Sequence, residues 1–554
     1  MKNTHALPNA QWGPYESSIQ EWIDKSEKLK IIPRLWQRDP LLWSKNLAAH
    51  KEIKNRLGWL STPRMMKSHL VELKAFQEAV KAGGFTHALL LGMGGSSLAA
   101  EVMQNILGNA PGFPELLVLD STDPGRIKDL EARIDLPKTL FIVSSKSGGT
   151  LELLSFFKYF YDRVKSVKPE NPGNSFIAIT DPGTQLEALA KQYGFWKTFL
   201  APEDVGGRFS ALTVFGMAPA AIIGVDVAKF LNGAERMMMD CSMEVPIREN
   251  VAVSLGIGMA VLAEEGRDKL TLLTSESIGS FGDWAEQLVA ESTGKDGLGV
   301  LPVVREAIQP AENYGTDRFF VELVLETEAK TNSQAVQALA LAGHPIVSIS
   351  LRTAYDLGAE FFRWEMATAI ASALLKINAF DQPDVQATKE ATKKYLDKIK
   401  SGGKIEIVQT DITLETFWEN AEPGDYAAIL AFLPDRESFQ KRLAKLRDAI
   451  RERTKLATTF GWGPRYLHST GQFHKGGTPN GVFILITSPS AEDVPVPGEN
   501  YTFSSLESAQ AMGELEALQN KARWVIHIRL QELSEAGLEE ACAKIESAIQ
   551  APVA

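Results

Sequence analysis

The residues best suited to binding a dianion lie in one short segment, SSKSGGT at residues 144–150, between an apolar run and a helical pattern. Its four hydroxyls, one ammonium and two glycines that expose backbone amides suit a phosphate, which needs several charge-assisted donors. A helix N-cap would need only one of these hydroxyls. The segment therefore predicts a phosphate pocket, with a merely polar turn as the alternative.

A second loop, GMGGSS at residues 92–97, also closes an apolar run and opens a helical one. Glycines let backbone amides approach an anion, and the following helix N-terminus adds partial positive charge. The loop lacks the Gly-Lys-Ser/Thr ending of a nucleotide-binding P-loop and the full dinucleotide fingerprint. We expect either a phosphate or sugar contact or a tight turn.

Three further residues could take part in the chemistry of a site. Gln287 and Glu291 are four residues apart, so they share one face of a predicted helix that Gly294 would end. A carboxylate near a helix C-terminus is disfavoured by the helix dipole, so the presence of Glu291 at this position needs an explanation. Arg208 follows two glycines, where its fixed charge could face a cleft. A structural carboxylate and a salt bridge at a helix start are the alternatives.

The elements that must position these residues belong to a long, acidic, globular chain. Its 554 residues predict three or four domains, or two large ones with an added piece. A formal net charge of −11 opposes general binding of nucleic acid. Two cysteines, 301 positions apart, supply neither a disulfide framework nor a zinc ribbon, which indicates a reducing compartment.

Neither export nor membrane insertion is expected. The N-terminus is polar where a signal peptide would be apolar. The longest uncharged stretch, residues 209–225, contains Pro219 and is shorter than the about 20 residues that span a bilayer. We interpret it as a buried helix of a soluble, cytoplasmic protein.

The pattern along the chain predicts an α/β fold of four parts: a helical arm (1–80), two α/β domains (81–225 and 226–400) and a third α/β unit (401–554). The basic segment 441–455 could touch nucleic acid, but acidic residues interrupt it, so a solvated helix face is favoured. The strands expected are 88–91, 139–143, 175–179, 270–274, 319–325, 345–351, 405–409, 426–433, 482–487 and 524–528.

Six segments together resemble signatures of the glucose-6-phosphate isomerase family: GMGGSS, SSKSGGT, VGGRFS, AESTGKDG, AFDQPDVQATK and LHSTGQFHKGG. The resemblance covers about residues 60–490 and is greatest to the isomerase half of transaldolase/glucose-6-phosphate isomerase fusions. A transaldolase barrel needs about 250 further residues, for which the chain has no room. The resemblance implies two doubly wound parallel sheets of the sugar-isomerase (SIS) type, with an N-terminal helical arm and a C-terminal α/β extension.

The resemblance also implies roles for individual residues. Glu291 would move a proton between C1 and C2, and Arg208 would stabilise the enediolate. Lys389 would assist ring opening, and His468 would act at the ring oxygen. The substrate-binding residues implied are Gly95, Ser96, Ser145, Lys146, Ser147, Thr150 and Gln287.

Two departures from the family pattern concern the ring-opening residues. Gln386 stands where the family usually has a glutamate, three residues before Lys389. His468 follows Lys389 by 79 residues, whereas the histidine motif usually comes first. Either the chain is rearranged around the same site, or His344 or His474 serves instead.

The resemblance implies reversible conversion of glucose 6-phosphate to fructose 6-phosphate in glycolysis and gluconeogenesis, by a homodimer without cofactor, nucleic-acid or membrane partner. No metal is expected, because the sequence lacks HxxH, HExxH and carboxylate clusters at ligand spacing. The alternatives are an isomerase of another sugar phosphate, such as mannose 6-phosphate, and a non-catalytic sugar-phosphate regulator. The presence of Glu291, Lys389 and Arg208 favours the enzyme over the regulator.

Overall fold

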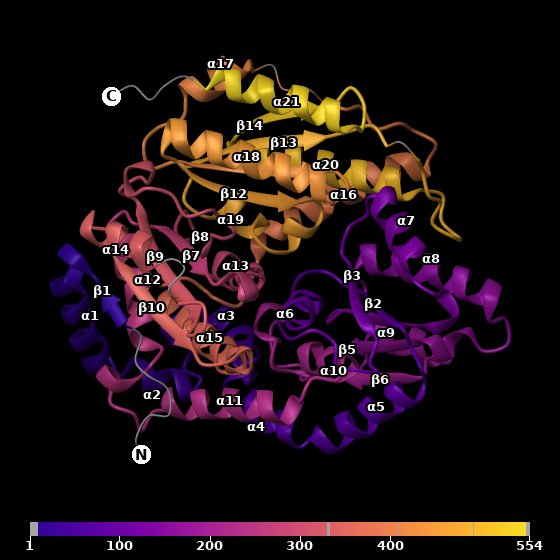
Figure 1. Cartoon of the computed structure of the whole chain (residues 1–554), viewed down its shortest axis with the longest axis horizontal. Helices are drawn as coiled ribbons and strands as arrows, with labels where there is room; N and C mark the ends of the chain where they lie inside the picture. The colour runs from indigo at the N-terminus through magenta and orange to yellow at the C-terminus, as the bar shows by residue number, and fades with distance from the viewer. Residues whose placement is uncertain (1–8, 330–332, 409, 411, 491, 550–554) are drawn as a thin grey trace.

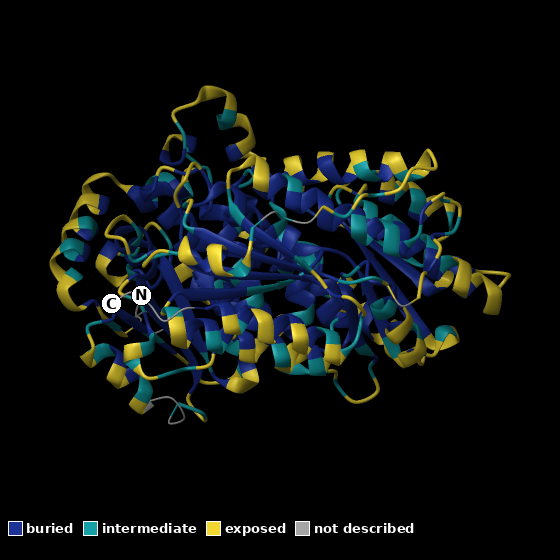
Figure 2. Ribbon diagram, turned by 90° about the horizontal axis from the view of Figure 1, so that it is seen from above, coloured by how far each residue is buried: buried dark blue, intermediate teal, exposed yellow. Residues whose placement is uncertain are grey.

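The computed structural model describes residues 9–329, 333–408, 410, 412–490 and 492–549. Three sheets lie around a central region where helices α6 (Leu98–Leu107) and α13 (Phe281–Thr293) meet (Figure 1). The strands are buried, and the outward faces of the surrounding helices are exposed (Figure 2). Within the described residues, no helix combines the length and apolar character that crossing a bilayer would require.

The first sheet has the order β3-β2-β4-β5-β6, and all its pairs are parallel. Neighbouring residues of β2 pack into different cores, Ala88 and Leu90 into one and Leu89 and Leu91 into the other. Helices must therefore cover both faces, as parallel sheets require. The elements are β2 (His87–Leu91), α6 (Leu98–Leu107), β3 (Glu115–Leu119), α7 (Pro124–Arg133), β4 (Thr139–Ser144), α8 (Leu151–Val167), β5 (Phe176–Thr180), α9 (Gln185–Gln192) and β6 (Lys197–Leu200).

The second sheet has the order β1-β10-β9-β7-β8, parallel except for β1, which the N-terminal arm adds antiparallel at one edge. Its elements are β1 (Asn9–Gln11), α12 (Val253–Glu264), β7 (Lys269–Thr274), α13 (Phe281–Thr293), β8 (Leu301–Val303), β9 (Arg318–Leu325), α14 (Ser333–Leu341), β10 (Ile346–Leu351) and α15 (Leu357–Leu374).

The arm and the segment between the two sheets are helical. The arm contains α1 (Glu16–Lys28), α2 (Ile31–Trp36), α3 (Leu47–Lys54), α4 (Thr62–Lys67) and α5 (Leu70–Ala82). The connecting helices are α10 (Val214–Ile222) and α11 (Val227–Asp240). Every residue of α10 is buried, so the uncharged stretch is a buried helix, as expected.

The third sheet, β12-β11-β13-β14, is parallel throughout. Its unit also holds α16, which packs along α20 and so joins the end of the second unit to the third. The elements are α16 (Pro383–Lys400), α17 (Leu414–Glu419), β11 (Tyr426–Phe432), α18 (Glu437–Thr454), β12 (Ala457–Trp462), α19 (Gly471–Gly476), β13 (Gly481–Thr487), α20 (Phe503–Asn520), β14 (Trp524–Arg529) and α21 (Glu535–Ala548).

Nine of the ten predicted strands are present, but the strand expected at 405–409 is wrong. Ile405 and Ile407 pack against a core, yet residues 405–408 join no sheet, and Gln409 lies outside the described residues. The carbonyl of Val408 lies 2.6 Å from Nδ1 of His527 instead of pairing with a strand. The prediction also missed five short strands, β1, β3, β6, β8 and β12.

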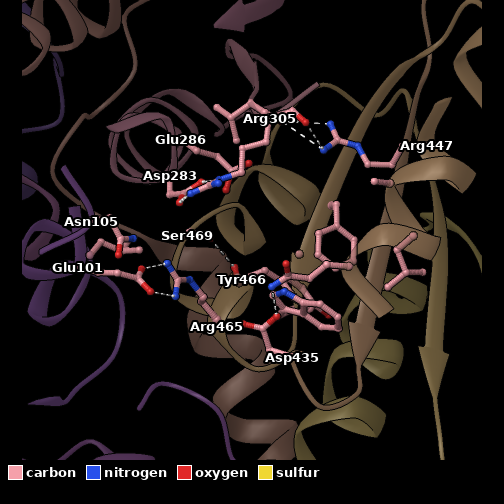
Figure 3. A pocket seen from close by; sticks show the side chains of 18 residues that line it. Glu101, Asn105, Asp283, Glu286, Arg305, Asp435, Arg447, Arg465, Tyr466 and Ser469 are labelled. Carbon is pink, nitrogen blue, oxygen red and sulfur yellow. Dashed lines mark hydrogen bonds and ion pairs between the residues drawn. The ribbon is translucent and has the colours of Figure 1, made fainter. Parts of the chain in front are cut away.

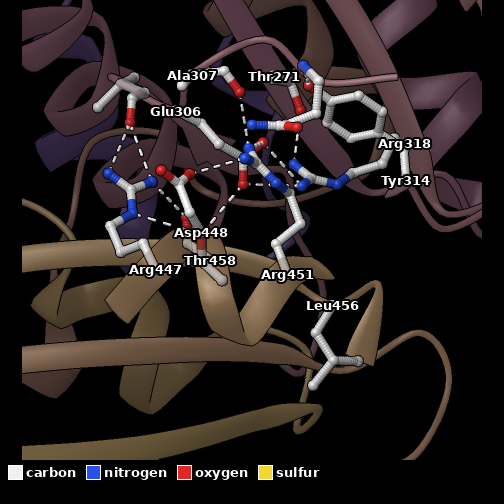
Figure 4. A network of polar contacts seen from close by, with 12 residues as sticks. Thr271, Glu306, Ala307, Tyr314, Arg318, Arg447, Asp448, Arg451, Leu456 and Thr458 are labelled. Carbon is white, nitrogen blue, oxygen red and sulfur yellow. Dashed lines mark hydrogen bonds and ion pairs between the residues drawn. The ribbon is translucent and has the colours of Figure 1, made fainter. Parts of the chain in front are cut away.

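The expectation of a solvated basic helix at 441–455 is wrong for its central arginines. In α18, Arg447 and Arg451 are buried against the second unit. Glu306 lies between Arg451 and Arg318, at 3.4 and 2.9 Å, and accepts a hydrogen bond from Thr458 (Figure 4). The basic residues of this face therefore hold two parts of the protein together.

This network predicts a large effect of removing its central charge. Glu306→Gln should lower the free energy of unfolding by about 3–5 kcal/mol in urea titrations, because Arg318 and Arg451 would stay buried without their shared counter-charge. Asp448→Asn is the control, since that carboxylate also pairs with Arg451 but is 36% exposed; it should cost at most about 1 kcal/mol. Equal, small losses for both variants would contradict this role of Glu306.

Candidate functional site

The two loops predicted to bind phosphate lie side by side. GMGGSS follows β2 and SSKSGGT follows β4, and these strands are parallel neighbours, so their carboxyl ends meet at one sheet edge. The hydroxyl of Ser144 donates to the carbonyl of Ser96 at 2.8 Å and ties the loops together. This edge is where ligands bind in open α/β sheets.

The serine-rich loop is braced from inside. The hydroxyls of Ser145 and Thr150 lie 2.9 Å apart, and the amide of Gly148 donates to Ser145 at 3.1 Å. The ammonium of Lys146 is in a close ion pair with Asp181. Thr150 precedes α8 but its side chain caps none of the helix amides. The start of α8 therefore keeps amide donors for an anion.

The glycines of GMGGSS are required by close packing against the rest of the site. A Cβ on Gly94, whose φ is +54°, would lie 2.7 Å from the carbonyl oxygen of His468 and 2.9 Å from the Gln287 amide nitrogen. A Cβ on Gly95 would lie only 2.1 Å from the carbonyl oxygen of Gly207. The loop thus contacts the histidine segment, α13 and the Arg208 segment at once.

Helix α13 presents Gln287 and Glu291 together, as their spacing predicted. One oxygen of Glu291 lies 3.0 Å from the Arg208 guanidinium, and the other accepts from the Gln287 amide at 3.1 Å. The same amide nitrogen donates to the carbonyl of His468 at 2.8 Å. The carboxylate is 12% exposed, so it is held in place but not sealed off.

Arg208 is the most heavily bonded residue of this group. Besides Glu291, its guanidinium donates to the side chains of Ser292 and Gln382, at 3.0 Å each, and to the carbonyls of Ala379 and Asp381, at 2.6 and 2.8 Å. Its side chain is only 5% exposed. It joins its own loop to α13 and to the segment that leads into α16.

A cavity of about 400 Å³ opens beside this cluster. Ser147, Thr150, Lys389 and His468 all line it, so it collects residues from the serine-rich loop, α16 and the turn before α19. Ser145 and Lys146 are not among its lining residues, nor are Gly95 and Ser96, which brace the loops behind it. Arg208, Gln287 and Glu291 are also not among its lining residues, but the Gln287 amide joins their cluster to the backbone of His468, which does line it.

His468 is oriented by a carboxylate that the sequence interpretation missed. Its Nε2 lies 3.1 Å from an oxygen of buried Glu152, which also accepts from Gln510 at 2.8 Å. Burial raises the pKa of Glu152, but the bond to His468 and the charges of His468 and Lys389 outweigh it, so that pKa lies below its ordinary value. The proximity of Glu152 to the SSKSGGT motif was a signal for it, whereas nothing local marked Gln510.

Lys295, within AESTGKDG, was also missed. Its ammonium is buried, contacts the carbonyl of Asn378 and lies 3.3 Å from the Asp381 carboxylate. Burial, followed by the charge of nearby Arg208, lowers its pKa to about 7. It adds a titratable group beside the Arg208–Glu291 pair.

The two reserve histidines lie elsewhere. His344 is buried 3.4 Å from Arg267, and burial together with that charge lowers its pKa to about 4. His474 is buried against the Tyr426 hydroxyl at 3.0 Å, and burial holds its pKa well below the ordinary value. Neither lines the 400 Å³ cavity. Gln386 is exposed and bonds only Glu390 among the described residues.

Comparisons with known proteins show the family of this chain. Residues 57–298 match the family model of phosphoglucose isomerase. A probable glucose-6-phosphate isomerase of Methanococcus maripaludis is 30% identical over 393 residues, which are 64% of this chain and 87% of that protein. The chain belongs to the glucose-6-phosphate isomerase family. A glucose-6-phosphate isomerase of Carboxydothermus hydrogenoformans is 28% identical, over 63% of this chain and 86% of that one.

Solved structures confirm the fold expected for this family. A hypothetical protein of Thermus thermophilus aligns with a TM-score of 0.61 and 25% identity, covering 70% of this chain and all of that one. A glucose-6-phosphate isomerase of Chlamydia trachomatis aligns at 0.56 and 18% identity, covering 69% and 86% of the two chains. The predicted α/β class is therefore confirmed, as the relatives confirm the predicted family. The particular resemblance to transaldolase fusions stays a prediction.

This isomerase-family chain has a second cavity, of about 370 Å³, where the three units meet (Figure 3). Its arginines are already paired: Arg465 bonds Glu101, and Arg305 makes two bonds to Asp283, at 2.6 and 2.5 Å. Arg447 donates to backbone carbonyls, including that of Val304. With no free guanidinium, this cavity is poorly suited to a phosphate. Within the described residues, no group of three or more His, Cys, Asp or Glu is placed to hold a metal.

Glu286 lines this second cavity without a hydrogen-bond or ion-pair partner among the described residues, and burial, followed by the charge of Asp283, raises its pKa to about 8. Between its unfolded pKa and 8, the folded state therefore holds a proton that the unfolded state has released. Stability should fall as pH rises through this window.

We predict that Glu286→Gln removes this loss, because an amide cannot ionise. The melting temperature of the variant should rise relative to that of the native protein between pH 5 and pH 8.5. Exposed Glu390→Gln is the control and should follow the native protein at every pH. A constant difference between Glu286→Gln and the native protein across this range would refute the role assigned to Glu286.

Proposed function

We propose that this protein interconverts glucose 6-phosphate and fructose 6-phosphate through a cis-enediol(ate), with Glu291 as the base. The observation that carries the proposal is the placement of Glu291 between the Arg208 guanidinium and the Gln287 amide, which itself bonds the backbone of His468. The proposed proton acceptor, the positive charge of Arg208 and the cavity wall at His468 are thus joined through short contacts.

A carboxylate suits this reaction because a proton must leave one carbon and return to its neighbour. A glutamate of ordinary pKa, about 4.3, is ionised at neutral pH and can accept the proton without special tuning. C1 and C2 are adjacent, so one carboxylate can serve both. Glu291 would therefore act as base in the first step and as acid in the second.

Arg208 is the group that stabilises the negative charge developing on the enediolate oxygen. Its guanidinium is buried and its five N–H donors are all bonded, so it would act through its fixed charge at short range and not through a new hydrogen bond. It lies 3.0 Å from the proposed base, so an oxyanion that it stabilised would be next to the carbon that loses its proton.

His468 and Lys389 are suited to opening the sugar ring. Both line the 400 Å³ cavity, although they come from different helical segments. Glu152 holds Nε2 of His468 and so fixes the orientation of the imidazole. This shared cavity supports a rearranged chain order around the same site rather than a role for His344 or His474.

The phosphate of the substrate lies far from the reacting carbons, so the energy of binding it serves to hold those carbons in position. The hydroxyls of Ser147 and Thr150 and the uncapped start of α8 face the cavity that would receive it. Ser145 supports the loop by bonding Thr150 and Gly148. Gly95 and Ser96 would contribute by holding the neighbouring loop in place.

We expect a homodimer in the cytoplasm, as the family resemblance implies. Mannose 6-phosphate differs from glucose 6-phosphate only at C2, so a second substrate of this kind is the nearest alternative function. A non-catalytic regulator is less well supported, because it would need no carboxylate paired with Arg208.

The test is the activity of the purified protein and of Glu291→Gln. The native protein should interconvert glucose 6-phosphate and fructose 6-phosphate in a coupled assay. The amide retains the shape of the side chain but cannot accept a proton, so kcat should fall at least about 1,000-fold while KM changes little.

Glu286→Gln is the matched control, because Glu286 lies on the same helix but lines the other cavity. Its kcat should stay within about two-fold of the native value. Near-native turnover by Glu291→Gln would remove Glu291 as the base. If mannose 6-phosphate is converted faster than glucose 6-phosphate, mannose 6-phosphate is the main substrate.

A further inference from the structure

We propose that Lys393, which lines the same cavity as the serine-rich loop, supplies the positive charge that binds the substrate phosphate. This inference rests on the proposed function, in which the ligand carries a dianionic phosphate. It adds to the site a residue that lies outside the family motifs singled out in the sequence.

The serine-rich loop offers hydroxyls and amides to the cavity but no free positive charge. Its one cation, Lys146, is in a close ion pair with Asp181 and lies 3.4 Å from the carbonyl of Glu203. Lys146 is also not among the residues lining the cavity. Arg208 is occupied by Glu291 and four other acceptors. A phosphate bound at this loop therefore needs its counter-charge from another element.

Helix α16 also lines this cavity and carries that charge. Lys389 and Lys393 both line the cavity, and their spacing of four residues places them about 6 Å apart on one helix face. Neither ammonium makes an ion pair with any residue that the structure describes. Lys400 also lines the cavity but lies 3.6 Å from Glu499.

The acidic groups on the cavity wall do not cancel these charges. Glu152 is bonded to His468 and Gln510. Asp397 lines the same wall but forms no ion pair within the described part of the chain. Two unpaired ammonium groups against one unpaired carboxylate leave the wall positive, in a protein whose net charge is −11. A phosphate is attracted to this wall against the overall field of the protein.

The two lysines are suited to different tasks. Lys389 is close enough to Glu152 for its charge to act on the His468–Glu152 pair. Lys393 lies one helical turn further along. Its acidic neighbour on this face is Asp397, with which it forms no ion pair within the described residues, so its ammonium is available to the phosphate. Lys389 would serve ring opening, and Lys393 would serve binding.

The chain offers a matched control at the next position. Lys394 carries the same charge on the same helix, but it pairs with Glu516 at 3.0 Å and does not line the cavity. Lys393→Gln and Lys394→Gln therefore make the same change in net charge, one inside the cavity and one outside it. Lys393→Arg retains the charge at the first position.

Binding should be measured by calorimetry with inorganic phosphate and with glucitol 6-phosphate, which has no carbonyl and cannot be isomerised. A charge-assisted hydrogen bond is worth about 1.5–3 kcal/mol, so Lys393→Gln should weaken both ligands about ten-fold or more. KM for glucose 6-phosphate should rise in parallel, with kcat within about two-fold. Lys394→Gln and Lys393→Arg should bind both ligands within about three-fold of the native protein, since the cavity keeps its charge.

Unchanged binding in Lys393→Gln, or an equal loss in Lys394→Gln, would overturn the assignment. The calorimetric measurements need no turnover, so they separate this inference from the proposed function. A native protein that binds phosphate through Lys393 but converts no hexose phosphate would contradict the function and support the inference. If the native protein isomerises the sugar normally and Lys393→Gln binds phosphate as tightly as the native protein does, the inference alone is contradicted.

Discussion

The burial of one guanidinium, that of Arg208, is the constraint on which the site depends. Removing such a charge from water costs several kcal/mol unless it is paired and its donors are bonded. The donors of Arg208 reach acceptors on α13 and on the segment 379–382, and Glu291 is the one charged acceptor among them. The same contacts that satisfy the arginine fix the position of the proposed base, because moving Glu291 away would leave a buried charge uncompensated.

The segment that accepts from Arg208 leads directly into α16, and α16 packs along α20 of the third unit. The third unit also reaches the second through Glu306 and the buried arginines of α18. Residues 401–554 therefore form part of the site and supply His468 and Gln510 to its cavity. Lys389 precedes His468 in the chain, but the two meet across one cavity, because the geometry of a site depends on packing and not on chain order.

Much of this could be predicted from local sequence. Buried parallel strands are continuous apolar runs, so strands such as β4 and β11 were easy to find, and the Gly- and Ser-rich loops that follow β2 and β4 marked the sheet edge correctly. β8 was missed because it has only three residues and contains a proline, and β6 was missed because it is a short, half-exposed edge strand. The burial of Arg451 was not predictable, because its buried partner Glu306 lies more than a hundred residues away in the chain. Glu152 stands close to the SSKSGGT motif, but its contacts with the histidine segment and α20 could not be read from local sequence.

The central claim is that a carboxylate carries the proton between C1 and C2, and hydrogen exchange with solvent tests it most directly. The native protein should be incubated with glucose 6-phosphate in heavy water through many turnovers, so that each exchange event adds to the last, and the product followed by NMR. A proton held on Glu291 between the two steps can exchange, so deuterium should accumulate at C2 of glucose 6-phosphate and C1 of fructose 6-phosphate. Complete retention of the original hydrogen while the sugars reach equilibrium would contradict the account and indicate direct hydride transfer between the carbons.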